Sequence, residues 1–395
     1  YQYIKEVRYN QFGQRVKLSY GNGVVTDYLY EPATRLLRKK NITRGSPSDL
    51  LRSVTYKYDK ADNIVGVQDS RRSQAQPFLS QFDRSFIYDD LHQLKTFTLE
   101  RTHSAPSAGI DTIKTEGTYA YDKVGNIENQ FIKQQQNGNL LADYPSRDWD
   151  YIYADSDRPN LPDSIGPYKF IYDARGSIVS STLNPNASSD DPPGSIFAWN
   201  DMGRLETSQW GNREKTGYVY NHEGQRISKQ TPALLDNPLA ALVDLSVYPN
   251  PYYIARFIKT TGDSATCANS PCWDEVSSRS KQIYLDGERI AVTAMWVDNA
   301  NSSEEGLVIK GESRHFLHSD PVSSVTLVTD ENGKRAQEVD YLPFGEILSD
   351  RQAPKYSGKP QPFRFDGKEL DVETGLQYFG FRYYDPRFGR WISAD

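Results

Sequence analysis

One nine-residue phrase, YAYDKVGNI at residues 119–127, recurs along this chain. Its two tyrosines, Tyr119 and Tyr121, fall on one face of a strand because side chains alternate along a strand with a period of two. Asp122 and Gly125 follow, and this combination is typical of a tight hairpin turn that the acid caps. The phrase therefore predicts a β-hairpin with one aromatic face, and it favours a turn cap over a catalytic role for the acid.

Degenerate copies of the phrase fall at irregular intervals of 21 to 51 residues. The aromatic residue before the acid, or before its substitute, is Tyr9, Tyr30, Tyr58, Tyr88, Tyr121, Tyr172, Trp199 and Tyr220. A single hairpin cannot bury its ring face, whereas hairpins paired side by side bury that face and remove free edges. The copies predict an array of hairpins with inserted loops, and their irregular spacing argues against a β-propeller enzyme, which needs a steady period of about 40 residues.

Composition agrees with thin sheets rather than one thick core. The chain has 395 residues, 37% of them hydrophobic, with 27 Tyr and 16 Phe. Tyrosine suits a strand because it buries its ring and keeps its hydroxyl near water. The net charge is -6 and the basic residues are scattered, so we expect no nucleic-acid partner. The most apolar short run, Ile290–Val297, is far shorter than the roughly 20 residues of a membrane span.

The pattern changes after about residue 230. Pro232–Leu245 predicts the one helix of the chain, although Pro238 weakens it, and Asp298–Gly306 predicts a polar loop. Strands are predicted within Gln282–Met295, Arg314–Leu317 and Thr326–Val328. We expect three regions: residues 1–230, residues 231–313 with one short helical segment and polar loops, and residues 314–395.

The sequence favours no metal or cofactor site. Cys267 and Cys272 suit a small disulfide loop or two free thiols better than zinc, which needs more ligands than two sulfurs. His315 and His318 are three residues apart on a predicted strand, which points them to opposite faces. Phosphate-binding loops and nucleophile motifs are missing from the sequence.

Beyond residue 314 the motifs become far more specific. They read HFLHSD at 315–320, VTLVTDENG at 325–333, YLPFGE at 341–346, RFDGKE at 364–369 and ETGLQYFGFRYYDPRFGRW at 373–391. This region strongly resembles the Rhs-repeat-associated core of bacterial YD-repeat toxins, and the upstream Tyr-Asp phrases agree with that family. Residues 248–257 and 281–291 look most like the branch of Tc-toxin C components. Residues 320–324 depart from the family pattern because they lack its usual glycine.

The resemblance implies an all-β fold in which the hairpin array coils into a hollow shell, with an Rhs-associated core plug at its C-terminus. It implies a secreted virulence factor whose shell encloses a C-terminal cytotoxic segment, and whose plug is an aspartyl autoprotease that frees this cargo. The implied partners are the enclosed segment and other parts of the toxin complex, such as a B-component-like subunit or a delivery apparatus. Arg382 and Asp395 stand where the family has an arginine and the first of two catalytic aspartates.

Aspartyl proteolysis needs two carboxylates that share a proton. The family carries the second aspartate and the scissile bond downstream of the first, and this sequence ends at Asp395. We therefore expect the chain alone to be inactive. A structural salt bridge explains Arg382 as well as catalysis does, and Trp391 is predicted to anchor the plug core. Because the sequence begins at Tyr1 without a targeting signal, we expect a fragment or a processed product.

A second class of function fits the same repeats. Teneurin-like receptors and cell-wall-associated proteins also use them, so an adhesion or carbohydrate-binding surface protein is the alternative. The parent gene beyond Asp395 discriminates the two classes, because a variable toxin-like tail supports the toxin shell and a receptor architecture supports adhesion.

Overall fold

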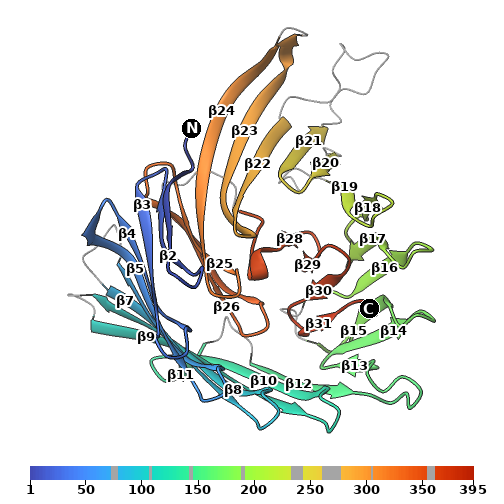
Figure 1. Ribbon diagram of the computed structural model, residues 1–395. Coiled ribbons are helices and arrows are strands. Elements are labelled where there is room, and N and C mark those ends of the chain that lie inside the picture. The colour runs from blue at the N-terminus through green and yellow to red at the C-terminus, as the bar shows by residue number, and fades with distance from the viewer. Residues whose placement is uncertain are drawn as a thin grey trace. The chain divides into compact units, whose positions relative to one another are not determined.

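The computed structural model describes nine stretches of the chain, residues 1–72, 79–105, 109–141, 146–187, 192–232, 243–259, 277–303, 306–353 and 361–395. They form two compact units (Figure 1). Unit 1 comprises Tyr1–Lys169 and Asn184–Asp191, and unit 2 comprises Phe170–Leu183 and Pro192–Asp395. Within the described residues, no helix has the length and apolar character that crossing a bilayer requires.

Unit 1 is a series of antiparallel strands in which almost every strand pairs with the next one along the chain. Its strands are β1 (Ile4–Tyr9), β2 (Arg15–Tyr20), β3 (Val24–Tyr30), β4 (Leu37–Arg44), β5 (Ser46–Tyr58), β6 (Ile64–Arg72), β7 (Leu79–Tyr88), β8 (Leu94–Ala105), β9 (Gly109–Tyr121), β10 (Ile127–Gln136), β11 (Asn139–Leu140), β12 (Arg147–Ile152) and β13 (Ser164–Ile165). The division between the units falls within β14 (Tyr168–Tyr172).

Unit 2 continues the same pattern from β15 to β27, with each strand antiparallel to the next. These strands are β15 (Ile178–Leu183), β16 (Ser195–Trp199), β17 (Leu205–Trp210), β18 (Thr216–Tyr220), β19 (Arg226–Pro232), β20 (Val243–Asn250), β21 (Tyr253–Lys259), β22 (Ser277–Leu285), β23 (Glu288–Ser303), β24 (Gly306–Ser319), β25 (Val325–Thr329), β26 (Arg335–Tyr341) and β27 (Ile347–Gln352). A separate four-stranded sheet follows, made of β28 (Glu369–Asp371), β29 (Leu376–Tyr378), β30 (Tyr383–Asp385) and β31 (Arg390–Trp391). The prediction of an all-β hairpin array is confirmed, and the helical content of the described residues is one 3-10 turn, Phe365–Gly367.

Two predictions beyond residue 230 are wrong where the structure describes them. The predicted helix over Pro232–Leu245 has a strand at each end, because Pro232 closes β19 and pairs with Val243 of β20. Pairing with neighbouring strands outweighs the weak helix propensity of the segment. The predicted loop over Asp298–Gly306 is instead the hairpin end of β23 and β24, in which Asp298 pairs with Val308. Residues 233–242 and both cysteines lie outside the described residues.

The remaining strand predictions of this region agree with the structure. Arg314–Leu317 lies in β24, and Thr326–Val328 lies in β25. Gln282–Met295 falls on β22 and β23, which are joined by a two-residue turn at Asp286 and Gly287. The predicted region boundaries near residues 230 and 314 stay predictions.

The acid of the Tyr-Asp phrase, or the Asn in its place, caps most of the turns, as predicted. In the turn after β5, one carboxylate oxygen of Asp59 accepts hydrogen bonds from the backbone N–H groups of Ala61 (2.8 Å) and Asn63 (2.9 Å). This local bonding holds the chain reversal without help from the rest of the fold. The same pair of bonds recurs at Asn10, Asp89, Asp122, Asp173, Asn200, Asp320 and Asp330.

In seven hairpins an aromatic residue just before the turn bonds the hairpin before it. The Tyr88 hydroxyl donates to the backbone oxygen of Ile64 at 3.0 Å, and Ile64 is the first residue of the preceding return strand. Equivalent bonds run from Tyr30, Tyr58, Tyr121, Tyr153, Trp199 and Tyr341, each to the first residue of an earlier strand. The sequence analysis expected tyrosine hydroxyls near water, whereas these six hydroxyls and the Trp199 indole N–H bond protein backbone and so fix the spacing between hairpins.

The turn at Asp320 forms without the glycine that the family usually has there. Ser323 takes the left-handed conformation with a φ of 67°, and its N–H donates to the Asp320 backbone oxygen at 3.1 Å. The Asp320 side chain accepts from Ser324 N–H at 2.8 Å, as in the other turns. Side-chain capping therefore holds a serine in a conformation that glycine adopts more easily.

The strands of unit 2 curve around its C-terminal segment, residues 361–395. Tyr383 bonds Tyr220 at the end of β18, and the next residue, Tyr384, bonds the Phe344 oxygen in the turn after β26. In a flat sheet these two strands, eight positions apart, would be separated by roughly 40 Å, whereas consecutive Cα atoms lie about 3.8 Å apart. We call strands β15–β27 of unit 2 the wall. The wall must therefore bend round β30. Figure 1 shows the red β28–β31 sheet between the green β15–β18 strands and the orange β25–β26 strands.

Candidate functional site

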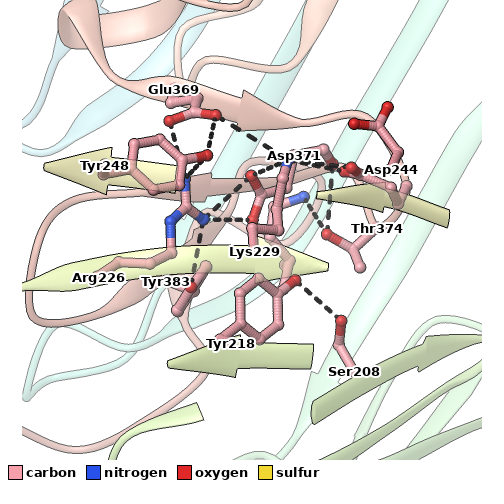
Figure 2. Close-up of polar contacts among 12 residues, drawn as sticks. Ser208, Tyr218, Arg226, Lys229, Asp244, Tyr248, Glu369, Asp371, Thr374 and Tyr383 are labelled. Atoms are coloured by element: carbon pink, nitrogen blue, oxygen red, sulfur yellow. Dashed lines mark hydrogen bonds and ion pairs between the residues drawn. The ribbon is translucent and has the colours of Figure 1, made fainter. Parts of the chain in front are cut away.

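A cluster of five charged side chains joins the C-terminal segment to β19, and Figure 2 shows most of it. We call it the unit 2 charge cluster: Arg226, Lys229, Glu369, Asp371 and Glu373. The Arg226 guanidinium lies 2.8 Å from the carboxylates of both Asp371 and Glu369. The Lys229 ammonium lies 2.9 Å from Asp371 and 3.0 Å from Glu373. Two cations of the wall therefore hold three acids of the segment.

Local sequence explains how the three acids converge. Glu369 and Asp371 lie two residues apart on β28, which places both on one face of the strand. Asp371 also accepts the backbone N–H groups of Thr374 and Gly375 on its carbonyl oxygen, which makes the turn that carries Glu373. On the wall, Arg226 is the first residue of β19 and follows the turn capped by Asn221. On each side of the cluster, therefore, a strand and an adjacent turn position the charged side chains before the two sides meet.

Burial and charge oppose each other in this cluster. The side chains of Arg226 and Asp371 are fully buried. Burial acts to raise the pKa of Asp371, but the charges of Arg226 and Lys229 outweigh it and hold that pKa below its ordinary value. For Glu373, burial prevails over the attraction of Lys229, and its pKa is raised. Asp371 is therefore the fixed anion of the cluster.

Tyrosines fill the remaining positions around Arg226. The Tyr248 hydroxyl donates to Glu369 at 2.9 Å, and the Tyr378 hydroxyl accepts the backbone N–H of Arg226 at 2.9 Å. The guanidinium carbon lies 4.2 Å from the centre of the Tyr378 ring. Ion pairs with aromatic cover suit a mechanical tie between wall and segment, because each of the three acids contacts one of the two cations.

Arg382 and Asp395, the predicted site residues, lie together. Their side chains form an ion pair of 3.1 Å, in which Asp395 is 90% exposed and Arg382 27% exposed. The β30–β31 hairpin brings them together, since Tyr384 pairs with Trp391 and Arg382 and Asp395 flank its open end. The guanidinium also stacks over Trp391 at 4.3 Å. The pair presents a cation-bound carboxylate to solvent.

Trp391 is half-buried and contacts Phe379 at 4.8 Å between ring centres, so it packs within the C-terminal segment. The two histidines have separate buried partners. His318 bonds the Thr329 hydroxyl at 3.0 Å, and His315 bonds the Gln361 side chain at 2.8 Å. Burial lowers the pKa of His315 to about 4, so it is neutral at ordinary pH. Both rings serve packing.

Sequence reasoning missed the unit 2 charge cluster and a second buried cluster in unit 1. There, Asp69 is fully buried between Arg52 (2.9 Å) and Arg71 (2.7 Å). The alternating acids at 369, 371 and 373 were a readable signal of an acidic strand face, although nothing in the sequence named their cationic partners. No comparable signal marks Asp69.

Comparison with known proteins supports the fold. Residues 304–395 match the Teneurin YD-shell family. Two toxin subunits of Yersinia entomophaga, YenC1 and YenC2, are 22% and 24% identical to the chain over 99% of its length. The chain spans 39% and 40% of those two relatives.

A crystal structure of a TcdB2-TccC3-Cdc42 complex superposes with a TM-score of 0.76 at 22% identity, over 99% of this chain and 18% of that one. At this identity the likeness establishes the fold alone. The chain therefore has the fold of this toxin structure, and its residues 304–395 are similar to the Teneurin YD-shell family.

Proposed function

We propose that the chain is part of a secreted toxin shell that encloses a cytotoxic polypeptide, with residues 361–395 acting as its plug. The observation that carries this proposal is the course of β30. Its consecutive residues Tyr383 and Tyr384 bond two places on the wall that lie eight strands apart, the end of β18 and the turn after β26. A wall that bends round one polypeptide segment can exclude solvent from others. Relatives that are named toxin subunits and match nearly the whole chain point the same way.

Self-cleavage beside Asp395 is the second part of the proposal. The Asp395 carboxylate is exposed to water and held 3.1 Å from Arg382. In an aspartyl mechanism one carboxylate activates water while a second, protonated carboxyl donates to the scissile carbonyl. By resemblance to the family, we expect that second carboxyl downstream of Asp395. The role of Arg382 is then to orient the Asp395 carboxylate as the base through the 3.1 Å ion pair.

Self-cleavage is tested by expressing the full-length gene product and measuring the fraction of cut chains by mass spectrometry. We expect cleavage on the C-terminal side of Asp395, and its loss in D395N and R382A. D366N is the matched control, because Asp366 is a half-exposed aspartate of the same segment that pairs with Lys368. Equal cleavage in D395N and in the unchanged protein would overturn this part of the proposal.

Enclosure is tested with the cut protein. We expect the downstream fragment to co-purify with the shell, to resist added protease, and to become digestible once the shell is unfolded with denaturant. A fragment that is digested as quickly in the folded complex as after denaturation would show that no enclosure exists.

An adhesion function is the competing proposal, because the matched family carries the name of the teneurins. It predicts that the full-length product is uncut, displayed on the cell surface and retained there by a receptor-type architecture. Detection of an intact, surface-bound chain would favour adhesion over the toxin shell.

A further inference from the structure

The ion pair between Arg382 and Asp395 cannot set its own geometry. Asp395 is 90% exposed, and exposed ion pairs contribute little because water and salt screen them. A long arginine side chain in such a pair samples several rotamers unless packing restricts it. Stacking on Trp391 restricts the end of the guanidinium but leaves the direction of the backbone at Arg382 to be fixed by something else.

That direction is fixed by Tyr383, the neighbour of Arg382 on the edge of β30. Tyr383 is 1% exposed, and its hydroxyl lies 3.1 Å from the Tyr220 hydroxyl and 3.4 Å from the Arg226 guanidinium. Successive side chains on a strand point to opposite faces. Because the Tyr383 side chain is held against the wall, the side chain of the preceding residue, Arg382, points away from the wall.

The anchor itself is rigid. Arg226 is held by Asp371 and Glu369, so the partner of the Tyr383 hydroxyl belongs to the unit 2 charge cluster rather than to a mobile side chain. On the other side of Arg382, the N–H of Phe379 donates to the Arg382 backbone oxygen at 3.0 Å. The backbone at Arg382 is thus fixed from both sides.

We infer that Tyr383, anchored by Arg226 and Tyr220, is a positioning residue that aims Arg382 at Asp395 for self-cleavage. This inference rests on the proposed function of the Arg382 and Asp395 pair. Self-cleavage would then depend on the buried contacts between plug and wall, because Arg382 is oriented toward Asp395 only when the plug is docked.

The experiment is a double-mutant cycle on the rate of self-cleavage in the full-length gene product. Y383F removes one hydroxyl and keeps the ring, and R382K keeps the charge but loses the planar fork. We expect Y383F to slow cleavage by about 10- to 100-fold, the usual cost of misplacing a reacting group by about 1 Å. In the R382K background the same change should have no further effect, because Tyr383 acts through the arginine.

Y88F is the control, since Tyr88 also donates one hydroxyl bond, 3.0 Å long, but lies in unit 1. It should leave the rate unchanged. A merely structural Tyr383 would give additive losses in the cycle, and this result would overturn the inference, as would an unchanged rate in Y383F. If D395N cleaves normally, or if the unchanged protein never cleaves, the proposed self-cleavage fails and the inference fails with it. If D395N loses cleavage but Y383F cleaves at the normal rate, only the inference fails.

Discussion

The two buried charge clusters use the same chemistry over very different lengths of chain. In unit 1, Arg52 and Asp69 are 17 residues apart on neighbouring strands, β5 and β6. In unit 2, Arg226 and Asp371 are 145 residues apart, one on the wall and one on the plug. In both clusters the aspartate is fully buried, and neighbouring cations lower its pKa despite that burial: Arg226 and Lys229 for Asp371, and Arg52, Arg71 and Arg84 for Asp69.

The difference shows that one type of interaction has two structural roles. The pairing of β5 with β6 sets Arg52 opposite Arg71 and only two positions along from Asp69, so the ion pairs reinforce a register that the hairpin makes. No strand of the wall pairs with β28 in the described residues, whose partner is β29. At β28 the unit 2 charge cluster therefore joins wall and segment through side chains, whereas in unit 1 the backbone pairing of β5 with β6 already brings the charged residues together.

The largest expected effect comes from breaking each cluster at its aspartate. D371N leaves Arg226 and Lys229 without their shared anion, and loss of one partner from a buried ion pair costs about 3–5 kcal/mol. We expect faster hydrogen exchange in two distant stretches, residues 226–232 and 361–395. D69N should cost a similar amount but should affect only the contiguous strands β5 to β7. Exchange measured by mass spectrometry on both variants checks the comparison.

The exposed ion pair Arg158 and Asp155 provides the control, because D155N should leave exchange in both regions unchanged. If D371N loosened only the plug and left β19 fully protected, the cluster would not tie wall to plug. If D69N loosened the plug as well, the contrast between a local and a long-range role would be lost.

A smaller difference is expected in the response to acid. The pKa of Asp69 and of Asp371 lies below the ordinary 3.8, so each contributes stability that is present above about pH 4 and is lost as the pH falls through its folded value. The raised pKa of Glu373 acts in the opposite sense, because its protonation on acidification relieves the cost of a buried charge. Acid should therefore weaken the unit 1 cluster more steeply than the unit 2 cluster.

Pulse proteolysis in urea with an acid-active protease, between about pH 5 and pH 2, measures this difference, because the loss begins near pH 4 and continues toward the lowered folded pKa values. E373Q should make the loss in unit 2 steeper, since it removes the compensating group, and D69N should flatten the loss in unit 1. Parallel curves for E373Q and the unchanged protein would show that Glu373 offsets nothing.

The smallest effect concerns the turns that both units share. Ser323 in unit 2 has a φ of 67°, whereas the equivalent residue in the turn of Asp122 in unit 1 is Gly125, with a φ of 92°. S323G should stabilise unit 2 by up to about 1 kcal/mol, because glycine adopts this conformation without strain. G125A should destabilise unit 1 for the same reason, and urea unfolding of both variants checks the signs. A loss of stability in S323G would mean that the Ser323 side chain contributes more than its strain costs.

The hairpins were predictable because every determinant of a hairpin lies within one phrase. Asp59 caps its own turn through Ala61 and Asn63, and the alternation of Tyr119 with Ala120 places one side chain inside and the other outside. The helix prediction over Pro232–Leu245 failed because it weighed local propensity alone. Val243 and its neighbours gain more from pairing with Pro232 and Lys259 than from an isolated helical turn.

The candidate site was only partly predictable. Arg382 and Asp395 were identified by resemblance, and the structure places them 3.1 Å apart. Arg226 and Lys229 carried no signal, because an arginine and a lysine in a polar strand are ordinary surface residues unless an acidic partner covers them. Tyr383 stood within a quoted motif, but its bond to Tyr220 spans 163 residues.

The sequence by itself determined the repeating unit: an aromatic strand, a capped turn and a return strand, all set by residues within about ten positions of one another. Tertiary structure alone decided how the plug docks. Docking brings together groups about 145 residues apart, and their pairing depends on how far each intervening hairpin bends the wall. Interactions that are short along the chain can be inferred from spacing, whereas this one depends on the summed curvature of many strands, which no single phrase encodes.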